Sequence, residues 1–114
     1  SQHRNIPSLR KLQPDPILEM APATAEARGI ADHDWVEIST KAGTFIARAK
    51  LGKDLAPGAV FAQHGWAVSD STDAPNTGGD AHAANMNTAI PTEQCDPVSG
   101  SIPLRCSWCE VRKA

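Results

Sequence analysis

The stretch formed by residues 63–105 constrains the fold more than any other part of this chain. Gly, Asn, Asp, Thr, Ser and Pro dominate it, and these residue types favour turns over helices or strands. After its first four residues it shows almost no apolar periodicity. A run of this length without regular structure is unusual in a small domain, and is either a binding loop or disordered.

The composition indicates one small domain. The chain has 114 residues, of which 40% are hydrophobic and 4% aromatic, with no Tyr, so Ala, Val, Ile and Leu must form the core. A net charge of −2 argues against nonspecific nucleic-acid binding, which needs a basic surface. No apolar run approaches the ~20 residues of a membrane span. The sequence therefore predicts neither a nucleic-acid partner nor a membrane segment.

The N-terminus gives an expectation about processing and location. The chain does not begin with Met and shows no signal peptide. We therefore expect a trimmed chain or a piece of a larger protein. The isolated chain is expected to be cytoplasmic, whereas the parent protein could be cytoplasmic or exported.

Short apolar segments with alternating patterns predict a mainly β fold with one short helix. Pro7, Pro14 and Pro16 predict an extended N-terminal arm, because proline disfavours a helix interior. A helix is expected at residues 22–28, between Pro22 and Gly29. Strands or extended segments are expected at residues 17–20, 35–40, 44–51, 59–62 and 104–112. Short strands joined by hairpins and irregular loops favour a small barrel, which removes exposed sheet edges.

The three cysteines, Cys95, Cys106 and Cys109, fit a reducing compartment better than a disulfide scaffold, because they cannot all pair within the chain. Cys106 and Cys109 form a C-x-x-C motif, but structural zinc needs four ligands. If the motif lies within a strand, the two thiols point to opposite faces, which favours cysteines that simply pack. The Gly100-Ser101 pair could mark a self-cleaving, pyruvoyl-forming decarboxylase, although it is also an ordinary turn pair.

Three groups of polar residues are candidates for ligand binding. Residues 63–66 end a strand and open the long stretch, where ligand contacts are common, although His64 could equally be a surface residue beside a core-covering Trp66. Residues 85–88 offer amides and a hydroxyl that suit a polar heterocycle or simply cap turns. The arginines match phosphate geometry but are also common on surfaces: Arg4, Arg10 and Arg105. Since no nucleophile, base or metal set is visible, a binding module is favoured over an enzyme.

The order of several segments resembles the C-terminal dinucleotide-binding domain of the molybdopterin oxidoreductases, the dimethyl sulfoxide reductase family. The resemblance covers essentially residues 1–114 as a single domain, and it rests on five segments in the right order: SQHRNIPSLR, PDPILEMAPATAEARGIADHDWVEISTKAGTFIARAKL, GAVFAQHGW, AANMNT and DPVSGSIPLR. It implies a double-psi β-barrel, an aspartate-decarboxylase-like barrel. In that family the barrel caps a bis-molybdopterin guanine dinucleotide cofactor, which holds molybdenum or tungsten.

The resemblance also implies site residues, matched by position. The cofactor-binding set is Ser1, Gln2, Arg4, His64, Trp66, Asn85, Asn87, Thr88 and Arg105. Asn and Gln suit a pterin edge, Arg suits a diphosphate, and a flat ring can lie against Trp. The family's metal ligand lies in an earlier domain, so this chain is expected to have no metal ligand or catalytic residue of its own. The remaining domains or a catalytic subunit would be its partners.

Two departures from the family pattern and one alternative bear on the structure. Family members commonly have Gly where this chain has His33. Gly would tolerate a positive φ at that position, whereas His would be strained there. The family often doubles the Trp after His-Gly and adds Pro, whereas Trp66 precedes Ala-Val-Ser. The alternative function is a cofactor-free barrel that binds proteins or recruits substrates. Without cofactor, we expect much of residues 69–84 to have nothing to order against.

Overall fold

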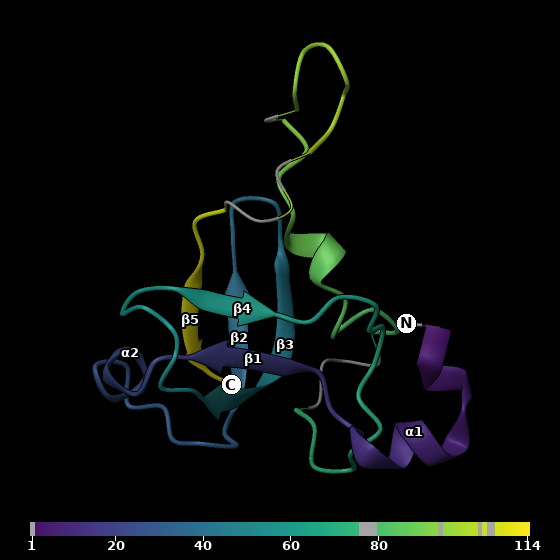
Figure 1. The fold of residues 1–114 in the computed structure, drawn as a ribbon, viewed down its shortest axis with the longest axis vertical. Helices are drawn as coiled ribbons and strands as arrows, with labels where there is room; N and C mark the ends of the chain where they lie inside the picture. Colours follow the sequence, from purple (N-terminus) through teal and green to yellow (C-terminus); the bar gives the residue numbers. More distant parts are fainter. Residues whose placement is uncertain (1, 76–79, 94, 103, 105–106) are drawn as a thin grey trace.

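The structure, a computed structural model, describes residues 2–75, 80–93, 95–102, 104 and 107–114. Its core is one five-stranded sheet in the order β4-β1-β3-β2-β5 (Figure 1). β1 pairs parallel with β3, and the remaining neighbours are antiparallel. The strands are β1 (Ile17–Met20), β2 (Trp35–Ser39), β3 (Thr44–Leu51), β4 (Val60–Ala62) and β5 (Glu110–Lys113). The helices are η1 (Gln2–Asn5), α1 (Pro7–Leu12), α2 (Pro22–Glu26) and η2 (Met86–Ala89).

Alternation along β2 and β3 gives the sheet two apolar faces, because successive side chains point to opposite sides. On one face, Val36 and Ile38 form a buried cluster with Ala47. Ala25 of α2 and Ile30 of the following turn pack against this cluster. The opposite face presents Trp35 and Ile46, which pack against residues from the long stretch. Both faces are therefore covered, one by α2 and its turn, the other by a loop.

The loop that covers the second face is residues 66–75 and 80–84, which we call the covering segment. Trp66, Ala83 and Ala84 are buried there against Trp35 and Ile46. The Ile46 amide donates to the Ala83 carbonyl at 2.8 Å, and the Ala84 amide donates to the Ala67 carbonyl at 2.8 Å. The expectation that residues 69–84 lack anything to order against is wrong for these described parts.

The structure confirms a mainly β fold, but the residues that it describes do not show the expected barrel. In the described part of the chain, β4 and β5 form the two ends of the sheet and do not pair with each other. β4 has three residues and pairs with β1 alone, so one edge is short, and no ladder closes the sheet across it. The sheet is therefore open over these residues.

The prediction of an extended N-terminal arm is wrong. Residues 2–5 form η1, and Pro7 begins α1 at a first-turn position, where its missing N–H costs no hydrogen bond. Pro14 and Pro16 follow the helix rather than interrupt it. No residue of α1 is buried, so the helix rests on the surface at the side of the sheet away from α2 (Figure 1).

The other expected elements are present, some of them with shorter bounds, and the long stretch contains a further helical turn. The helix over residues 22–28 appears as α2, and the four strands before the long stretch all form. The last segment is a strand only from Glu110, because residues 107–109 have no ladder partner. Cys109 thus precedes the strand, where it is half-buried against the core, and Cys106 lies outside the described residues. The long stretch also contains a short 3₁₀ turn, η2.

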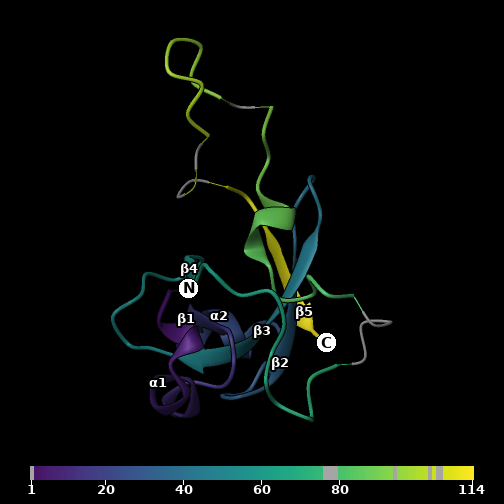
Figure 2. The ribbon, with the colours of Figure 1, turned by 90° about the vertical axis from the view of Figure 1, so that its right-hand side faces the viewer.

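A projecting segment, residues 91–93 and 95–102, rises away from the sheet beyond the β2–β3 hairpin (Figures 1 and 2). Asp96 organises its tip, since its carboxylate accepts from the Val98 and Ser99 amides at 3.0 and 2.7 Å. The Gly100 amide donates to the Asp96 carbonyl at 2.8 Å, and Gly100 has a positive φ of 70°. The Gly100-Ser101 pair is therefore part of a turn.

Candidate functional site

A cavity of about 520 Å³ lies between residues 2–13, which contain η1 and α1 and which we call the arm, and the end of β4. It is mostly apolar at its walls, with a few cationic and amide groups among them. Residues of the arm, of β4 and of the chain just after β4 line it: Arg4, Leu9, Arg10, Leu12, Gln13, Phe61, Gln63, His64 and Trp66. A concave, partly apolar site with a few convergent polar groups is the usual form of a small-molecule site.

Arg4 is fixed against Trp66. Its guanidinium carbon lies 3.6 Å from the centroid of the Trp66 ring, a cation–π contact that joins the arm to the start of the covering segment. The Trp66 ring is itself buried, at 7% exposed, because it packs in the second apolar cluster. Arg4 Nη2 lies 3.5 Å from the Val68 carbonyl, whereas the buried Nη1 has no hydrogen-bond partner within the described residues.

Asp70 of the covering segment joins Arg4 to a second arginine, Arg10 of α1. Arg10 Nε donates to Asp70 Oδ2 at 2.6 Å, and its Nη2 contacts the other carboxylate oxygen. Arg4 Nη2 also donates to Oδ2, at 3.3 Å. The hydrogen bond from Arg10, together with the charges of Arg4 and Arg10, holds the pKa of Asp70 below its usual value despite partial burial. Two cavity-lining arginines thus share one carboxylate.

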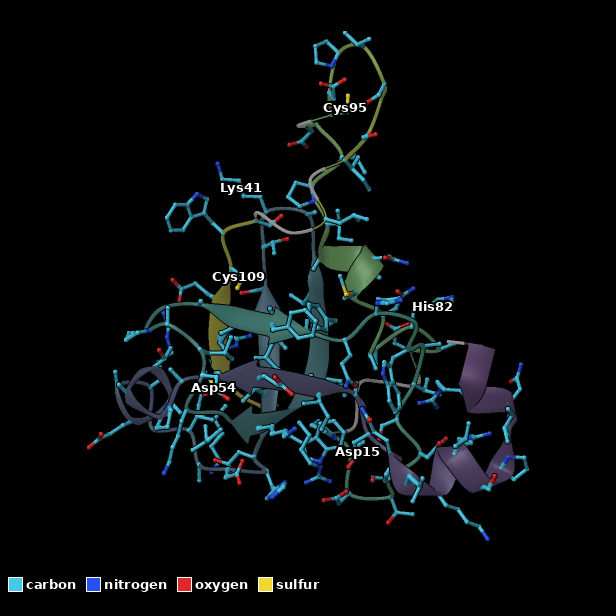
Figure 3. The ribbon with its side chains drawn as sticks, in the orientation of Figure 1. Asp15, Lys41, Asp54, His82, Cys95 and Cys109 are labelled. Carbon is cyan, nitrogen blue, oxygen red and sulfur yellow. The ribbon has the colours of Figure 1, made fainter. Side chains whose placement is uncertain are left out.

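A second set of polar contacts fastens the covering segment to the sheet. Arg48 of β3 donates to Asp15 Oδ2 at 2.7 Å and to both oxygens of Asp73 at 2.7 and 2.8 Å. Asp15, which lies where α1 leads into β1 (Figure 3), accepts in turn from the Ser69 hydroxyl at 2.7 Å. Asp15 is 7% exposed, so a buried charge depends on these partners. Burial of Arg48 opposes its charge, but the bonds to Asp73 and Asp15 outweigh this and raise its pKa.

Three of the expected site residues converge on the cavity. Arg4, His64 and Trp66 all line it, and Gln63 beside them contacts the Gln13 amide from the arm. The set implied by the resemblance omits several residues that line the cavity: Leu9, Arg10, Leu12, Gln13 and Phe61. Of these, Arg10 is a candidate for anion binding from its charge alone, but its place depends on α1, which the proline pattern argued against.

The other expected site residues lie elsewhere. Asn85 precedes η2 and its side chain accepts from the Asn87 amide at 3.1 Å, the geometry of a turn cap. The Thr88 hydroxyl donates toward the Thr44 carbonyl, 2.8 Å away, so η2 is held on the β2–β3 hairpin. Asn85, Asn87 and Thr88 are not among the residues that line the cavity.

The remaining parts of the expected set cannot be placed in the same way. Ser1 and Arg105 lie outside the described residues, and for Gln2 only the backbone, in η1, is described. In the described ranges, no three His, Cys, Asp or Glu side chains are grouped so that they could hold a metal ion. Nor is any helix in those ranges long and apolar enough to span a membrane.

The class of protein follows from comparison with known protein families, which places the chain among the cofactor-binding domains of molybdopterin enzymes. Residues 1–107 match the family described as "Molydopterin dinucleotide binding domain". Because this match covers nearly the whole chain, the chain belongs to that family. The resemblance inferred from five sequence segments is thereby confirmed, as is the molybdopterin dinucleotide as the family's cofactor.

Curated relatives are much longer than this chain. A protein of Halobacterium salinarum, named as a dimethyl sulfoxide reductase catalytic subunit, is 36% identical over 73 residues, which cover 64% of this chain and 9% of that protein. The dopamine dehydroxylase of Eggerthella lenta is 32% identical over all 114 residues, which cover 11% of its length. The chain thus spans about a tenth of these relatives.

A solved structure supports the fold. The acetylene hydratase from Pelobacter acetylenicus aligns with 93% of this chain and 15% of its own chain, at a TM-score of 0.80 and 24% identity. At that identity the likeness concerns the fold alone.

Proposed function

We propose that this chain binds and positions molybdopterin guanine dinucleotide as the C-terminal cap of a molybdenum or tungsten oxidoreductase. The observation that supports the proposal best is the cavity where Arg4, Arg10, His64 and Trp66 meet. Family membership gives the cofactor class, and the cavity offers the chemical groups that such a cofactor needs. The metal ligand would come from other domains of the parent enzyme.

Arg4 and Arg10 are the groups that would hold the diphosphate. A guanidinium matches phosphate oxygens with two parallel N–H donors, and its charge persists at all physiological pH values. Arg4 Nη1 is buried and has no hydrogen-bond partner in the described part of the chain. An unpaired buried donor is costly, and a bound oxyanion would remove that cost if the Arg4 side chain turned to expose Nη1.

The amide and imidazole groups would serve the heterocyclic parts of the cofactor. Gln13, Gln63 and His64 offer both donors and acceptors, which suit the edge of a pterin or guanine. Leu9 and Phe61 supply apolar surface on which a flat ring can lie. When bound, the cofactor supplies the metal centre for two-electron redox chemistry, whereas this chain's residues bind it and exclude water.

We extend the proposal to the remaining site residues and to the barrel. Ser1, Gln2 and Arg105 would complete the contacts from the arm and the final segment, and Asn85, Asn87 and Thr88 would do so from η2. The double-psi closure of the barrel would involve the rest of the parent protein. The parallel β1–β3 pair within an otherwise antiparallel sheet supports a crossed topology of this kind.

One observation favours the alternative of a cofactor-free interaction module. Leu12 is 81% exposed and Phe61 is 58% exposed at the rim of the cavity, and exposed apolar side chains that cluster often mark protein contacts. That function predicts binding of an apolar peptide and no preference for nucleotides. The same surface would serve contacts with neighbouring domains in a parent enzyme.

A calorimetric titration of the chain with GDP tests the proposal. GDP contains the guanosine and diphosphate parts of the cofactor, so we expect weak, saturable binding that the Arg4→Gln substitution reduces. Arg112→Gln is the matched control, because Arg112 is 74% exposed on β5 and is not a cavity residue. If GDP fails to bind, or if both variants bind equally well, the proposed site is wrong. Measurement of cofactor loading in Arg105→Ala and Asn85→Ala forms of the parent enzyme tests the other residues, and reduced loading is expected in both.

A further inference from the structure

Asp70 is hydrogen-bonded to both arginines of the cavity wall, although Asp70 itself is not one of the residues that line the cavity. Arg10 presents its Nε–Nη2 fork to the two oxygens of Asp70, which is the bidentate geometry by which arginine also binds phosphate. The face of the Arg4 guanidinium lies on the Trp66 ring, and its Nη2 donates a hydrogen bond to Asp70. One internal carboxylate thus occupies donors of both arginines that a phosphate group would otherwise be able to use.

We infer that Asp70 is an internal counter-ion that an incoming phosphate group must displace, so that the anion site is occupied by the protein itself until ligand binds. This inference rests on the proposed function and adds a regulatory contact to the same site. A tethered carboxylate competes at a high effective concentration, which lowers the apparent affinity for free anions. Weakly bound anions would therefore be rejected, whereas a ligand with several further contacts could displace Asp70.

The backbone around Asp70 is held by contacts that do not involve its carboxylate. The Asp70 amide donates to the Pro14 carbonyl at 3.1 Å. The Ser69 hydroxyl is bonded to Asp15, and Asp73 is bonded to Arg48. Displacement of the Asp70 carboxylate therefore requires a side-chain rotation and leaves the covering segment in place.

The arginines can also adapt to a new partner. The Arg10 side chain is 52% exposed, and it projects from α1, which has no buried residue. Asp70 is 19% exposed, so water reaches part of the carboxylate and can solvate it after release. The low pKa of Asp70 keeps it ionised near neutral pH, where it competes fully.

The test compares the affinity for inorganic diphosphate of the wild-type chain with that of Asp70→Asn and Asp73→Asn. Asp73→Asn is the matched control, because it removes the same charge from the same segment, but its partner Arg48 does not line the cavity. At low ionic strength we expect Asp70→Asn to bind diphosphate about tenfold more tightly. We expect Asp73→Asn to change the affinity by no more than about twofold.

Equal affinities of wild type and Asp70→Asn, or a weaker Asp70→Asn, would overturn the inference, and so would the absence of diphosphate binding by Asp70→Asn. A weaker variant would show that Asp70 positions the arginines. GDP binding separates this from the proposed function. If wild type binds GDP and Asp70→Asn is not tighter for diphosphate, the inference alone fails. If Asp70→Asn is tighter for diphosphate while neither form binds GDP, the inference holds and the proposed function fails.

A second measurement uses only the wild-type chain, in case Asp70→Asn does not fold. The Asp70 side-chain carboxyl carbon is titrated by NMR with and without diphosphate. Displacement predicts that diphosphate raises the pKa of Asp70 toward its ordinary value, because the carboxylate loses its arginine partners. An unchanged or lower pKa in a diphosphate-saturated sample would overturn the inference.

Discussion

The Arg4 guanidinium lies on the face of the Trp66 ring, 3.6 Å from its centroid. This contact joins the first turn of the chain to the covering segment, and it brings the arm to the cavity. Trp66 can serve as a platform because it is buried against Trp35 of β2, Ile46 of β3 and the alanines at the end of the covering segment. The site therefore depends on packing on the second face of the sheet, and changes there are expected to affect ligand binding as well as stability.

Arg48 is expected to be the most important single charge for stability. Arg48→Met would leave Asp15 buried without its cationic partner and would release Asp73. We expect the free energy of unfolding to fall by about 2–4 kcal/mol, since a buried charge without a partner is costly. Urea denaturation of both proteins measures the difference.

The matched control for this change is Arg112→Met. Arg112 is 74% exposed and is paired with Glu37 at 2.6 Å. Exposed pairs contribute less than about 1 kcal/mol. Similar losses in Arg48→Met and Arg112→Met would contradict the role given to Arg48.

Gly43 allows η2 to approach the β2–β3 hairpin. A Cβ atom at this position would lie 2.5 Å from the Thr88 carbonyl oxygen, a backbone atom that cannot rotate away. We expect Gly43→Ala to lower the free energy of unfolding by about 1–3 kcal/mol. Gly52→Ala is the control, because nothing lies within 4 Å of a Cβ there. Equal denaturation midpoints for the two variants would refute the close approach.

Asn85 is expected to have a structural role that can be separated from ligand binding. Its side-chain oxygen accepts from the Asn87 amide, so Asn85→Ala should cost about 1 kcal/mol of stability. Asn85→Asp keeps an acceptor oxygen and should retain most of that stability. Thermal denaturation compares the two variants. If both lose stability equally, the cap does not explain the position.

Acid is expected to weaken the attachment of the covering segment. Hydrogen bonds from Arg10 to Asp70 and from Arg48 to Asp73 lower the pKa of both carboxyls below the ordinary 3.8. A depressed folded-state pKa gives stability that is present above 3.8 and is lost as the pH falls through the lowered value. The free energy of unfolding should therefore fall on acidification below 3.8, and it should fall less steeply in an Asp70→Asn, Asp73→Asn double variant. Identical pH slopes, measured by urea denaturation, would exclude these two pairs as the cause.

Local sequence patterns predicted the strands and α2 well, because alternation and the Pro22 and Gly29 boundaries act within a few residues. The turn at His33 is a further case, since the family pattern of Gly there implied a positive φ and the structure has 66°. α1 was missed because Pro7 was interpreted as a helix breaker, although it stands in the first turn, where proline is favoured.

Motif and family position put Arg4, His64 and Trp66 in the expected set, and the structure brings these three residues together around one cavity, while their role as a site stays a prediction. The shared carboxylate Asp70 could not be predicted, because its pairing with Arg10 joins residues far apart in the sequence and depends on how the covering segment folds back. The same holds for Arg48 with Asp15 and Asp73. Long-range ion pairs follow from the packed fold, and single-residue patterns do not encode them.

Amide NMR of the chain during a GDP titration tests the central claim most directly, because it locates the ligand as well as detecting it. The account predicts that the largest shift changes fall on the cavity residues of the arm and of the chain after β4, among them Arg4, Arg10 and His64. Residues of β5, such as Arg112, should not change. Shift changes confined to other surfaces, or none at saturating GDP, would contradict the assignment of this cavity as the cofactor site.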